Sequence, residues 1–566
     1  STALFALDDV VTLIWRGTTE YSTSHTITAA DVGSSLVMKV PKAQVVESND
    51  TVVTVYYTIW RELTGDTEES PLSVYEVYRE SGGADLIVLG TRNGELDLRM
   101  SGSGRYLRAV SATTRDDIVA EWRYEGDVTS ESGVSFLDKE PGRLLHVRTE
   151  NASLSVLPLH LVGNGLNNSS ANGAAAFAAR LSTGKPYAWG HFDHGGYIPP
   201  SLMELDIEEL HLTTFAFGAL RSNGDVVLWG DRDLGGGTTP LPTNVAQLTG
   251  SHMAFACVKR DGRLQAWGEP TSGGTLTQEA SAVSDAKSVF ANAWGFCAMR
   301  TNGHLLSWGP KNYGGEIPTE LKPYPHMSVR GNSSAFCALR TTGVVKAWGD
   351  QNNGGKLSTE VENASNIVEI AASTYGAFAV LTSERKVLAW GRHDYGGLVP
   401  DFIKQYNDIV EVVGIDYAFC ARREGGQIVC WGLADYGGVR PPEYAQEKFV
   451  QVTGTAVAFA ALRADGTVVT WGKGDRGGDS SLVQSELVDI RAIYANSQAF
   501  AAIPAGGGVV TWGLAAGGGM LTPDQKAVLS AYLRYDTPGS AVSASSPQGR
   551  ALAAFKKRRM VASAVS

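Results

Sequence analysis

Cysteine is scarce in this chain and basic charge is in deficit, and each shortage excludes a class of function. Only five cysteines occur in 566 residues and none forms a Cys-x-x-Cys pair, so neither a disulfide framework nor a zinc site is predicted. The formal net charge is −11, whereas a nucleic-acid binder needs a basic face that displaces counterions from phosphates. We therefore expect no metal, no cofactor and no nucleic-acid partner.

Long apolar runs are also missing. No stretch approaches the ~18–20 apolar residues that a membrane span requires, and the opening STALFALDDVV lacks the basic and apolar regions of a signal peptide. We expect no membrane span and no visible signal peptide, and the compartment stays open. The basic run KKRR at 556–559 is interpreted as a solvated tail in preference to a targeting or phosphate-binding segment.

Glycine is the residue in excess, with 65 copies, and it calls for turns at regular intervals. A Trp-Gly dipeptide recurs nine times at spacings of 38–42 residues. Such a period indicates a stacked or circular array of equivalent units. The nine tryptophans are Trp189, Trp229, Trp267, Trp308, Trp348, Trp390, Trp431, Trp471 and Trp512.

The register also holds inside each unit. A phenylalanine stands twelve positions before every one of these tryptophans, and two glycines stand six and seven positions after it. Five positions before the tryptophan there is a glycine in eight units, and Arg385 in the other. Asp-Gly and Asn-Gly at this point supply the positive φ angles of a tight hairpin.

About three short strands are predicted per unit: an apolar strand, the strand of the phenylalanine, and the strand that ends at the tryptophan. A unit this small cannot bury its own Trp and Phe, which are each worth several kcal/mol at ~25 cal/mol per Å² buried. A closed ring gives every unit two neighbours. The predicted fold is therefore all-β, a β-propeller of nine ~40-residue repeats, with a seven-bladed ring with atypical terminal units as the alternative.

The motif Gly-x-Val-x-x-Trp-Gly followed by a double glycine resembles the repeats of the regulator-of-chromosome-condensation family. The ~40-residue unit is most similar to its compact bacterial branch, which includes a secreted β-lactamase inhibitory protein. The resemblance covers roughly residues 155–520. It implies a propeller that acts through loops on one face, as an exchange factor, an enzyme inhibitor or an interaction domain. Nine units exceed the usual seven, and the even spacing leaves no room for a β-wedge insertion, which weighs against an exchange-factor role.

Four regions are predicted. Residues 1–80 alternate strand-like runs with polar turns, as in a small sandwich, and resemble immunoglobulin-like modules of bacterial surface proteins. Residues 81–155 form a second β module with strands near 85–90 and 118–124, and residues 156–521 form the propeller. Residues 522–566 begin with Thr522-Pro523-Asp524, a helix start, followed by a helix to about Leu533, a linker at 537–548 and the basic tail.

Residues just before the double glycine vary while the glycines are constant, as expected of a binding face on a rigid scaffold. The candidate binding residues are His194, Tyr313, Tyr395, Tyr436 and Arg476. The alternative is that the tyrosines pack on a neighbouring loop.

Eight positions before the tryptophan stands a basic residue in six units. These residues are Arg221, Lys259, Arg300, Arg340, Arg423 and Arg463. They would form a basic circlet at one end of the ring, and pairing with nearby acids is favoured over an anion-binding pore.

Three other motifs are weighed as chemical sites. His191, Asp193 and His194 lie close together as metal ligands would, but no other unit repeats the histidines and the sequence identifies no further ligand, so loop variation is favoured. GDQNNGGK at 349–356 has its lysine one place too late for a phosphate loop, and the repeat explains its glycines. Cys257, Cys297, Cys337 and Cys420 fall at or next to the slot after the phenylalanine, where other units have Ala or Gly, so they are interpreted as small core residues.

The sequence thus favours a non-enzymatic protein-binding propeller, secreted or at a bacterial surface by analogy, as an interaction, adhesin or toxin-associated component. The alternative is a carbohydrate-binding or hydrolytic protein that uses the propeller channel or the N-terminal β modules.

Overall fold

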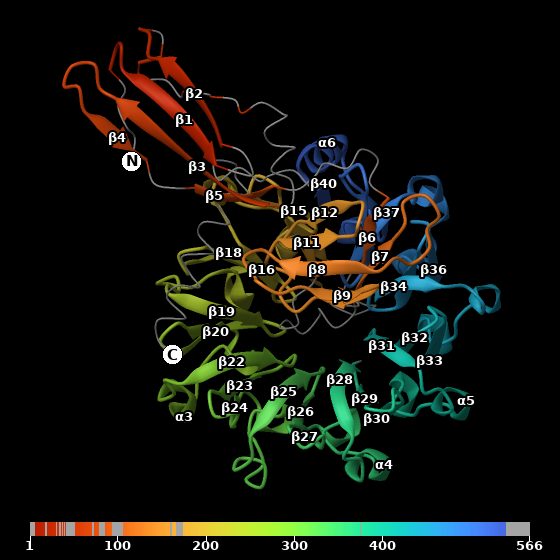
Figure 1. Cartoon of the computed structure of the whole chain (residues 1–566). Helices are drawn as coiled ribbons and strands as arrows, with labels where there is room; N and C mark the ends of the chain where they lie inside the picture. Colours follow the sequence, from red (N-terminus) through yellow and green to blue (C-terminus); the bar gives the residue numbers. More distant parts are fainter. Residues whose placement is uncertain are drawn as a thin grey trace.

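The computed structural model describes residues 6–16, 20–29, 31–32, 36, 38, 40, 51–70, 73–77, 85–92, 106–158, 161–165, 174–373 and 375–538. The architecture is an all-β propeller: three-stranded antiparallel sheets follow one another around a common axis, and further antiparallel sheets of three to five strands are formed mainly by the residues before them (Figure 1). The part of the chain described contains nine propeller sheets, which we number units 1 to 9 by their tryptophans in chain order.

Unit 2 illustrates the plan. β16 (Glu209–Leu212), β17 (Ala216–Leu220) and β18 (Val226–Gly230) pair in that order, and Phe217 lies directly opposite Trp229. We call the side of the ring where the second and third strands are joined the turn end. The opposite side, where the first two strands are joined and where the Trp-Gly loops lie, is the loop end.

The other sheets repeat this order, with the first strand innermost because the first strands of successive units contact each other around the axis. Units 1, 3, 4 and 5 are β13 (Leu161–Gly163), β14 (Ala176–Arg180), β15 (Pro186–Gly190); β19 (Val245–Gly250), β20 (Ala254–Lys259), β21 (Leu264–Gly268); β22 (Ala286–Ala291), β23 (Phe296–Arg300), β24 (Leu305–Trp308); and β25 (His326–Gly331), β26 (Ala335–Arg340), β27 (Val345–Gly349).

Units 6 to 9 are β28 (Ile367–Ser373), β29 (Ala377–Thr382), β30 (Val387–Gly391); β31 (Ile409–Gly414), β32 (Ala418–Arg423), β33 (Ile428–Gly432); β34 (Phe449–Gly454), β35 (Ala458–Arg463), β36 (Val468–Gly472); and β37 (Ile490–Ala495), β38 (Ala499–Pro504), β39 (Val510–Gly513). Single helical turns cross between units, among them α2 (Pro200–Met203), α3 (Gln278–Ser281), α4 (Thr359–Glu362) and α5 (Asp401–Lys404).

Each double glycine is the joint between two units. Its first glycine has a positive φ, for example +85° at Gly195, where a Cβ would lie 2.8 Å from the Phe217 ring of the next unit. A side chain there would separate the units. The carbonyl of the same glycine accepts a hydrogen bond from the indole Nε1–H of Trp229, at 3.1 Å. The second glycine packs on its own Trp-Gly backbone, since a Cβ on Gly196 would lie 2.6 Å from the Gly190 carbonyl carbon.

This indole bond is formed by all nine tryptophans, each to the preceding unit. Each tryptophan also stacks on the phenylalanine of its own unit, with ring centroids 5.0–5.6 Å apart.

The ring closes between the last unit and the first. Trp189 of unit 1 donates to the carbonyl of Gly518 in unit 9 at 3.2 Å, and the backbone N–H of Ser497 donates to Asn164 O at 3.1 Å. The first strands β37 and β13 are in contact as well. The first and last units therefore meet through the same contacts that join units along the chain.

The first strands of units 2 and 3 approach each other closely at Gly250, the last residue of β19. An added Cβ would lie 1.7 Å from the carbonyl oxygen of Leu212 on the neighbouring first strand. Gly250→Ala is expected to lower the free energy of unfolding by about 1–3 kcal/mol, as overpacking does, measured by urea denaturation. Gly506→Ala is the control, since nothing lies within 4 Å of its Cβ. Equal stability of the two variants would contradict the close approach.

The second module packs against the turn end of units 8 and 9. Its two sheets comprise β6 (Ile87–Leu89), β7 (Tyr106–Val110) and β10 (Ser135–Leu137), and β8 (Ala120–Tyr124), β9 (Glu131–Gly133), β11 (Leu145–Arg148), β12 (Ser153–Val156) and β40 (Asp536–Pro538). Gly90 N–H donates to Arg491 O in β37 at 2.9 Å, and Gln451 in β34 bonds Thr91 Oγ1 at 3.1 Å. In Figure 1 these strands lie across the upper part of the ring.

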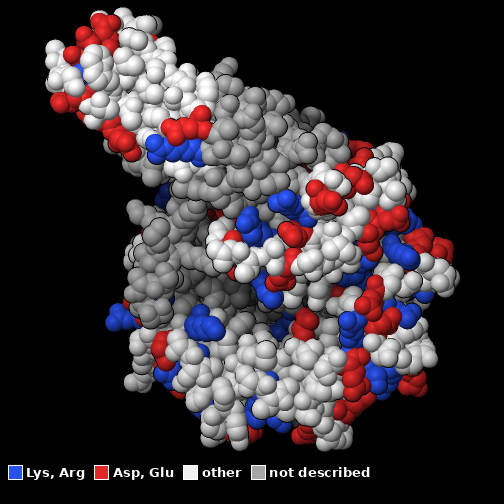
Figure 2. Space-filling view, in the orientation of Figure 1, with Lys and Arg blue, Asp and Glu red and all other residues white. Residues whose placement is uncertain are grey.

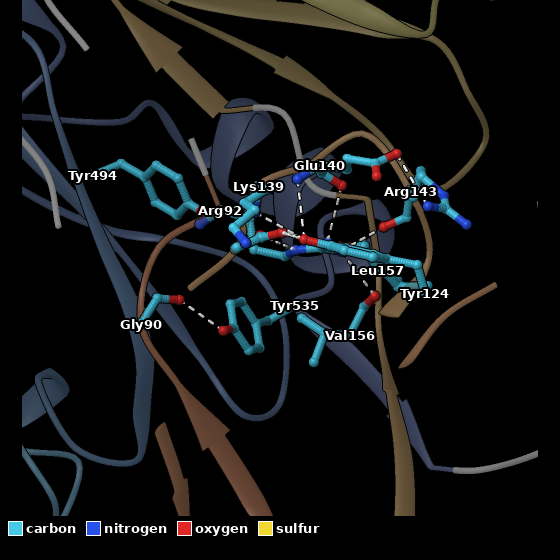
Figure 3. Close-up of polar contacts among 11 residues, drawn as sticks. Gly90, Arg92, Tyr124, Lys139, Glu140, Arg143, Val156, Leu157, Tyr494 and Tyr535 are labelled. Atoms are coloured by element: carbon cyan, nitrogen blue, oxygen red, sulfur yellow. Dashed lines mark hydrogen bonds and ion pairs between the residues drawn. The ribbon is translucent and has the colours of Figure 1, made fainter. Parts of the chain in front are cut away.

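A buried ion pair inside the second module lies next to this junction (Figure 3). Arg92 is 1% exposed; its Nε donates to Asp138 Oδ2 at 2.7 Å, and its Nη1 donates to the carbonyls of Arg143, Val156 and Leu157 at 2.8–3.1 Å.

Two tyrosine hydroxyls complete the network. The Arg92 backbone N–H donates to Tyr494 Oη of unit 9 at 3.4 Å, and the Tyr535 hydroxyl donates to Gly90 O at 2.6 Å. Because burial disfavours a charged phenolate, the pKa of Tyr494 lies well above its ordinary value. These hydroxyls therefore stay neutral and act as hydrogen-bonding partners of the junction.

The N-terminal region contributes one antiparallel sheet among the residues described. It consists of β1 (Val10–Arg16), β2 (Glu20–Thr26), β3 (Thr51–Trp60), β4 (Thr67–Glu69) and β5 (Ser73–Val77). Val11, Ile27 and Ile59 form a small core on it. Most of residues 35–40, one of the strand-like runs of the sequence, fall outside the described residues, and so does the basic run at 556–559.

The C-terminal segment confirms one prediction and corrects another. The predicted helix is α6 (Pro523–Tyr532), which begins with a capping box between Thr522 and Gln525. The predicted linker begins too early, because Asp536–Pro538 form strand β40 and pair with the edge of β12. An edge strand has unpaired backbone groups, and the three-residue strand β40 forms hydrogen bonds with those of β12. No helix in the described part of the chain is long and apolar enough to cross a membrane.

Candidate binding face at the loop end of the ring

The two ends of the ring differ in what covers them. Contacts of the second module fall near the starts of β34 and β37, which lie at the turn end. α6 also lies there, because Ser182 N–H, in the hairpin turn of unit 1, donates to Tyr532 O. The loop tips lie at the opposite end.

In seven of the nine units the loop tip is held by a side chain of its own unit. A polar residue at the turn between the first two strands donates to the tip carbonyl just before the double glycine, as Asn292 Nδ2 does to Tyr313 O at 2.6 Å. Seven units share this bond, from donors Asn164, Thr213, Ser251, Asn292, Asn332, Thr455 and Asn496. The tips of these seven units are therefore fixed to the turn beside them.

Four tyrosines from units 6 and 7 form a continuous aromatic cluster, which we call the tyrosine cluster. Tyr395 lies 4.7 Å from Tyr417 and 6.4 Å from Tyr375, both edge to face, and Tyr417 lies 5.0 Å from Tyr436, all between ring centroids. Tyr375 is 45% exposed. The guanidinium of Arg392 lies over the Tyr395 ring at 4.3 Å.

A second aromatic run crosses units 1 to 4. Its rings are His194, Phe215, His252, Trp294 and Tyr313, with successive centroids 4.8–5.7 Å apart. His194 is buried and its Nδ1 lies 2.9 Å from Thr214 O. Burial lowers the pKa of His194, so this ring is neutral near pH 7.

The structure thus distributes the candidate binding residues over three places. Tyr395 and Tyr436 come together through Tyr417, whereas Tyr313 and His194 stand at opposite ends of the second run. Arg476 lies apart in unit 8, where its guanidinium contacts Gln498 and lies 3.5 Å from Asp475.

Sequence reasoning missed Tyr375 and Tyr417. They stand three and two positions before the unit phenylalanine, at the turn between the first and second strands. Phe215, His252 and Trp294 occupy the same two slots in units 2 to 4, so an aromatic residue at this turn is the signal that would have found both aromatic groups.

The six basic residues lie at the turn end, and five of them have local partners. Arg300 Nε lies 2.8 Å from Asp285, Arg423 Nη2 lies 2.9 Å from Asp408, and Arg463 Nε lies 2.6 Å from Glu447. Arg340 lies over the Tyr324 ring at 3.8 Å and Arg221 Nε donates to Asp206 O at 3.2 Å. Lys259 ends β20. In three units the partner is thus an acid 15 or 16 residues earlier in the same unit.

The motifs weighed as chemical sites have structural roles in this fold. His191 and His194 pack edge to face, with centroids 5.4 Å apart. Asp350 caps a single helical turn and Gly354 has φ +94°, as its counterparts in other units do. No group of three or more metal-ligating side chains occurs among the described residues.

Figure 2 shows how charge is distributed on the face seen in Figure 1. Lys and Arg are interspersed with Asp and Glu over the ring, while the outer part of the N-terminal sheet carries mostly acidic residues. This mixing fits paired charges better than one continuous basic surface.

Comparison with known proteins gives distant likenesses. Models of known protein families and searches of curated proteins give no match. Among solved structures, the ectodomain of the Physcomitrella patens receptor kinase CR4 shares 15% identity over 48% of this chain and 72% of its own, with a TM-score of 0.34. Prp20p from Saccharomyces cerevisiae shares 16% identity over 51% and 80%, with a TM-score of 0.31. The CRINKLY WD40 ectodomain of the Arabidopsis thaliana receptor kinase ACR4 shares 20% identity over 46% and 93%, with a TM-score of 0.32.

Proposed function

We propose that this chain is a non-enzymatic binding protein that holds another protein against the loop end of a single nine-bladed ring. The observation that carries the proposal is the tyrosine cluster, in which the loop tips Tyr395 and Tyr436 and the neighbouring strand turns of Tyr375 and Tyr417 bring four rings together, with successive centroids 4.7–6.4 Å apart. Tyrosine supplies a large, rigid contact area at low entropic cost and is enriched at protein interfaces. The second module and α6 pack at the other end, where a spacer or anchor would leave the loops accessible. A secreted or surface role fits the resemblance of the repeats and of the N-terminal region.

The test combines cross-linking with substitution. A photoreactive phenylalanine analogue at Tyr375, 45% exposed, is expected to cross-link the partner from host or bacterial lysate, whereas the same analogue at Val488, 51% exposed at the turn end, is not. Replacing Tyr375, Tyr395 and Tyr436 together by alanine is expected to weaken capture of that partner by about 100-fold or more, as loss of interface hot spots does.

Two controls make the result specific. The corresponding phenylalanine variant keeps the ring packing and is expected to retain most of the binding, and Arg300→Ala at the turn end should change it less than about threefold. Unchanged capture by a folded triple-alanine variant would remove the loop end as the binding face. A glycan-array signal that the triple-alanine variant loses, with no protein captured, would replace the protein partner by a carbohydrate.

A further inference from the structure

Two cysteines of unit 7 face each other across adjacent strands. Cys420 in β32 lies directly opposite Cys430 in β33, and both side chains are buried. Directly opposed residues of an antiparallel pair have Cα atoms about 4.5–5.5 Å apart, which falls inside the range of about 4.4–6.8 Å found in disulfides. Their Sγ atoms lie 2.6 Å apart, closer than the roughly 3.5–4.0 Å of an ordinary non-bonded contact between carbon atoms.

The sister units provide an internal comparison. The same register position holds a pair of residues in every unit, and in eight of them the pair lacks two cysteines. These pairs are Ala178–Ala188, Gly218–Leu228, Ala256–Ala266, Cys297–Ser307, Cys337–Ala347, Ala379–Ala389, Ala460–Thr470 and Ala501–Thr511. A single cysteine at this position serves as a small core residue, so it is the second cysteine that distinguishes unit 7.

We infer that Cys420 and Cys430 are joined by a disulfide bond when the chain folds in an oxidising compartment. The oxidant is an external disulfide, either oxidised glutathione or a protein dithiol oxidase. One cysteine thiolate attacks the external disulfide and releases one thiol; the other thiolate then attacks the mixed disulfide and releases the second. Two cysteine thiols are oxidised, one external disulfide is reduced to two thiols, and the protons lost by the cysteines are taken up by the leaving thiolates.

The bond must form before the blade is covered. Burial raises the pKa of the Cys420 thiol, so little thiolate is present in the folded chain, and the thiolate is the reacting form. Both sulfurs lie in a core with Val413 of β31, Ile428 of β33 and Val452 of β34. The hairpin itself is local, because the turn between β32 and β33 joins residues only ten positions apart. The two sulfurs can therefore meet early, while the external oxidant still reaches them.

The full chain is tested by refolding in two redox buffers. After refolding with oxidised glutathione, unfolding and alkylation with N-ethylmaleimide, intact mass is expected to show three labelled cysteines rather than five, and peptide mapping a link between the segments of Cys420 and Cys430. Cys430→Ser is expected to label at all four remaining cysteines. Chain folded with reduced glutathione and exposed to the oxidised form only afterwards is expected to keep five reactive thiols. Five labelled thiols after oxidative refolding, or a link between any other pair, would overturn the inference.

A transplanted pair tests the register argument in another blade. Ser307→Cys places a cysteine opposite Cys297 in unit 4, at a position that is also buried. Oxidative refolding of this variant is expected to give a second disulfide and to leave two labelled cysteines, Cys257 and Cys337. A link in unit 4 without one in unit 7 would show that the wild-type pair remains reduced, and would overturn the assignment.

Discussion

Replacement of Arg92 by methionine is expected to lower the free energy of opening of the second module by about 3–5 kcal/mol, the cost of removing one partner of a buried ion pair. The reason is the carboxylate left behind. Asp138 is 3% exposed and would keep only the Tyr124 hydroxyl, which donates to its Oδ1 at 2.7 Å, as its partner in the network of Figure 3. The three carbonyls that Arg92 Nη1 satisfies would lose their donor as well. Because the chain has several cores, hydrogen exchange in residues 106–158 measures this loss better than a single global unfolding transition does.

Two further variants separate the charge effect from the loss of contact. Arg115 forms an ion pair with Asp489 of unit 9 at 2.8 Å, and the two side chains are 27% and 58% exposed. Arg115→Met is therefore expected to cost no more than about 1 kcal/mol. Arg92→Met combined with Asp138→Leu removes both charges and is expected to recover much of the loss. If Arg92→Met and Arg115→Met were equally mild, the buried pair would not be what stabilises the second module.

The ring could be predicted from the sequence because its determinants repeat. Phe217 and Trp229 stand at fixed positions and meet in register across β17 and β18, and the same pair recurs in every unit. Asp465-Gly466 is likewise a hairpin signal, and Gly466 has φ +83°. The hairpin turn requires a positive φ at this position even without glycine, since Arg385 adopts φ +58° where every other unit has glycine.

The role of the double glycine could not be predicted. From the sequence it marks only the end of a loop, because both of its partners belong to positions that the spacing alone does not bring near. In space, Gly195 abuts Phe217 of the next unit and accepts the Trp229 indole bond. The requirement for glycine therefore comes from the neighbouring unit, some 20–35 residues away in sequence.

The buried pair of the second module and the tyrosine cluster could not be predicted either, because the local sequence does not indicate them. Arg92 is a charged residue in a polar stretch, and its burial depends on carbonyls 51–65 residues away. Tyr375 and Tyr417 meet Tyr395 only because the turns of adjacent units lie side by side, as the bond from Tyr375 N–H to Asp416 O shows. The sequence names Tyr395 and Tyr436 as loop tips, whereas the cluster that they belong to is a property of the ring.

Trp189→Ala is expected to lower the free energy of unfolding by about 3–5 kcal/mol, the cost of deleting a fully buried tryptophan. Trp189 is 0% exposed. It stacks on Phe177 at 5.1 Å and donates to Gly518 O. These are the closure contacts, because Gly518 belongs to unit 9. Urea denaturation measures the loss, and small-angle X-ray scattering would show a larger radius of gyration if the ring opens.

Trp348→Ala is the matched comparison, since Trp348 is 2% exposed and makes the same stack and the same bond to Gly314 of the unit before it in the chain. In a closed ring the two substitutions cost similar amounts, because every tryptophan has a neighbour on both sides. In an open array the first unit would have no preceding unit, so Trp189 would already be exposed on one face and its loss would cost far less than that of Trp348. A difference of more than about 2 kcal/mol in that direction would therefore refute closure, and with it the fixed loop end on which the proposed binding depends.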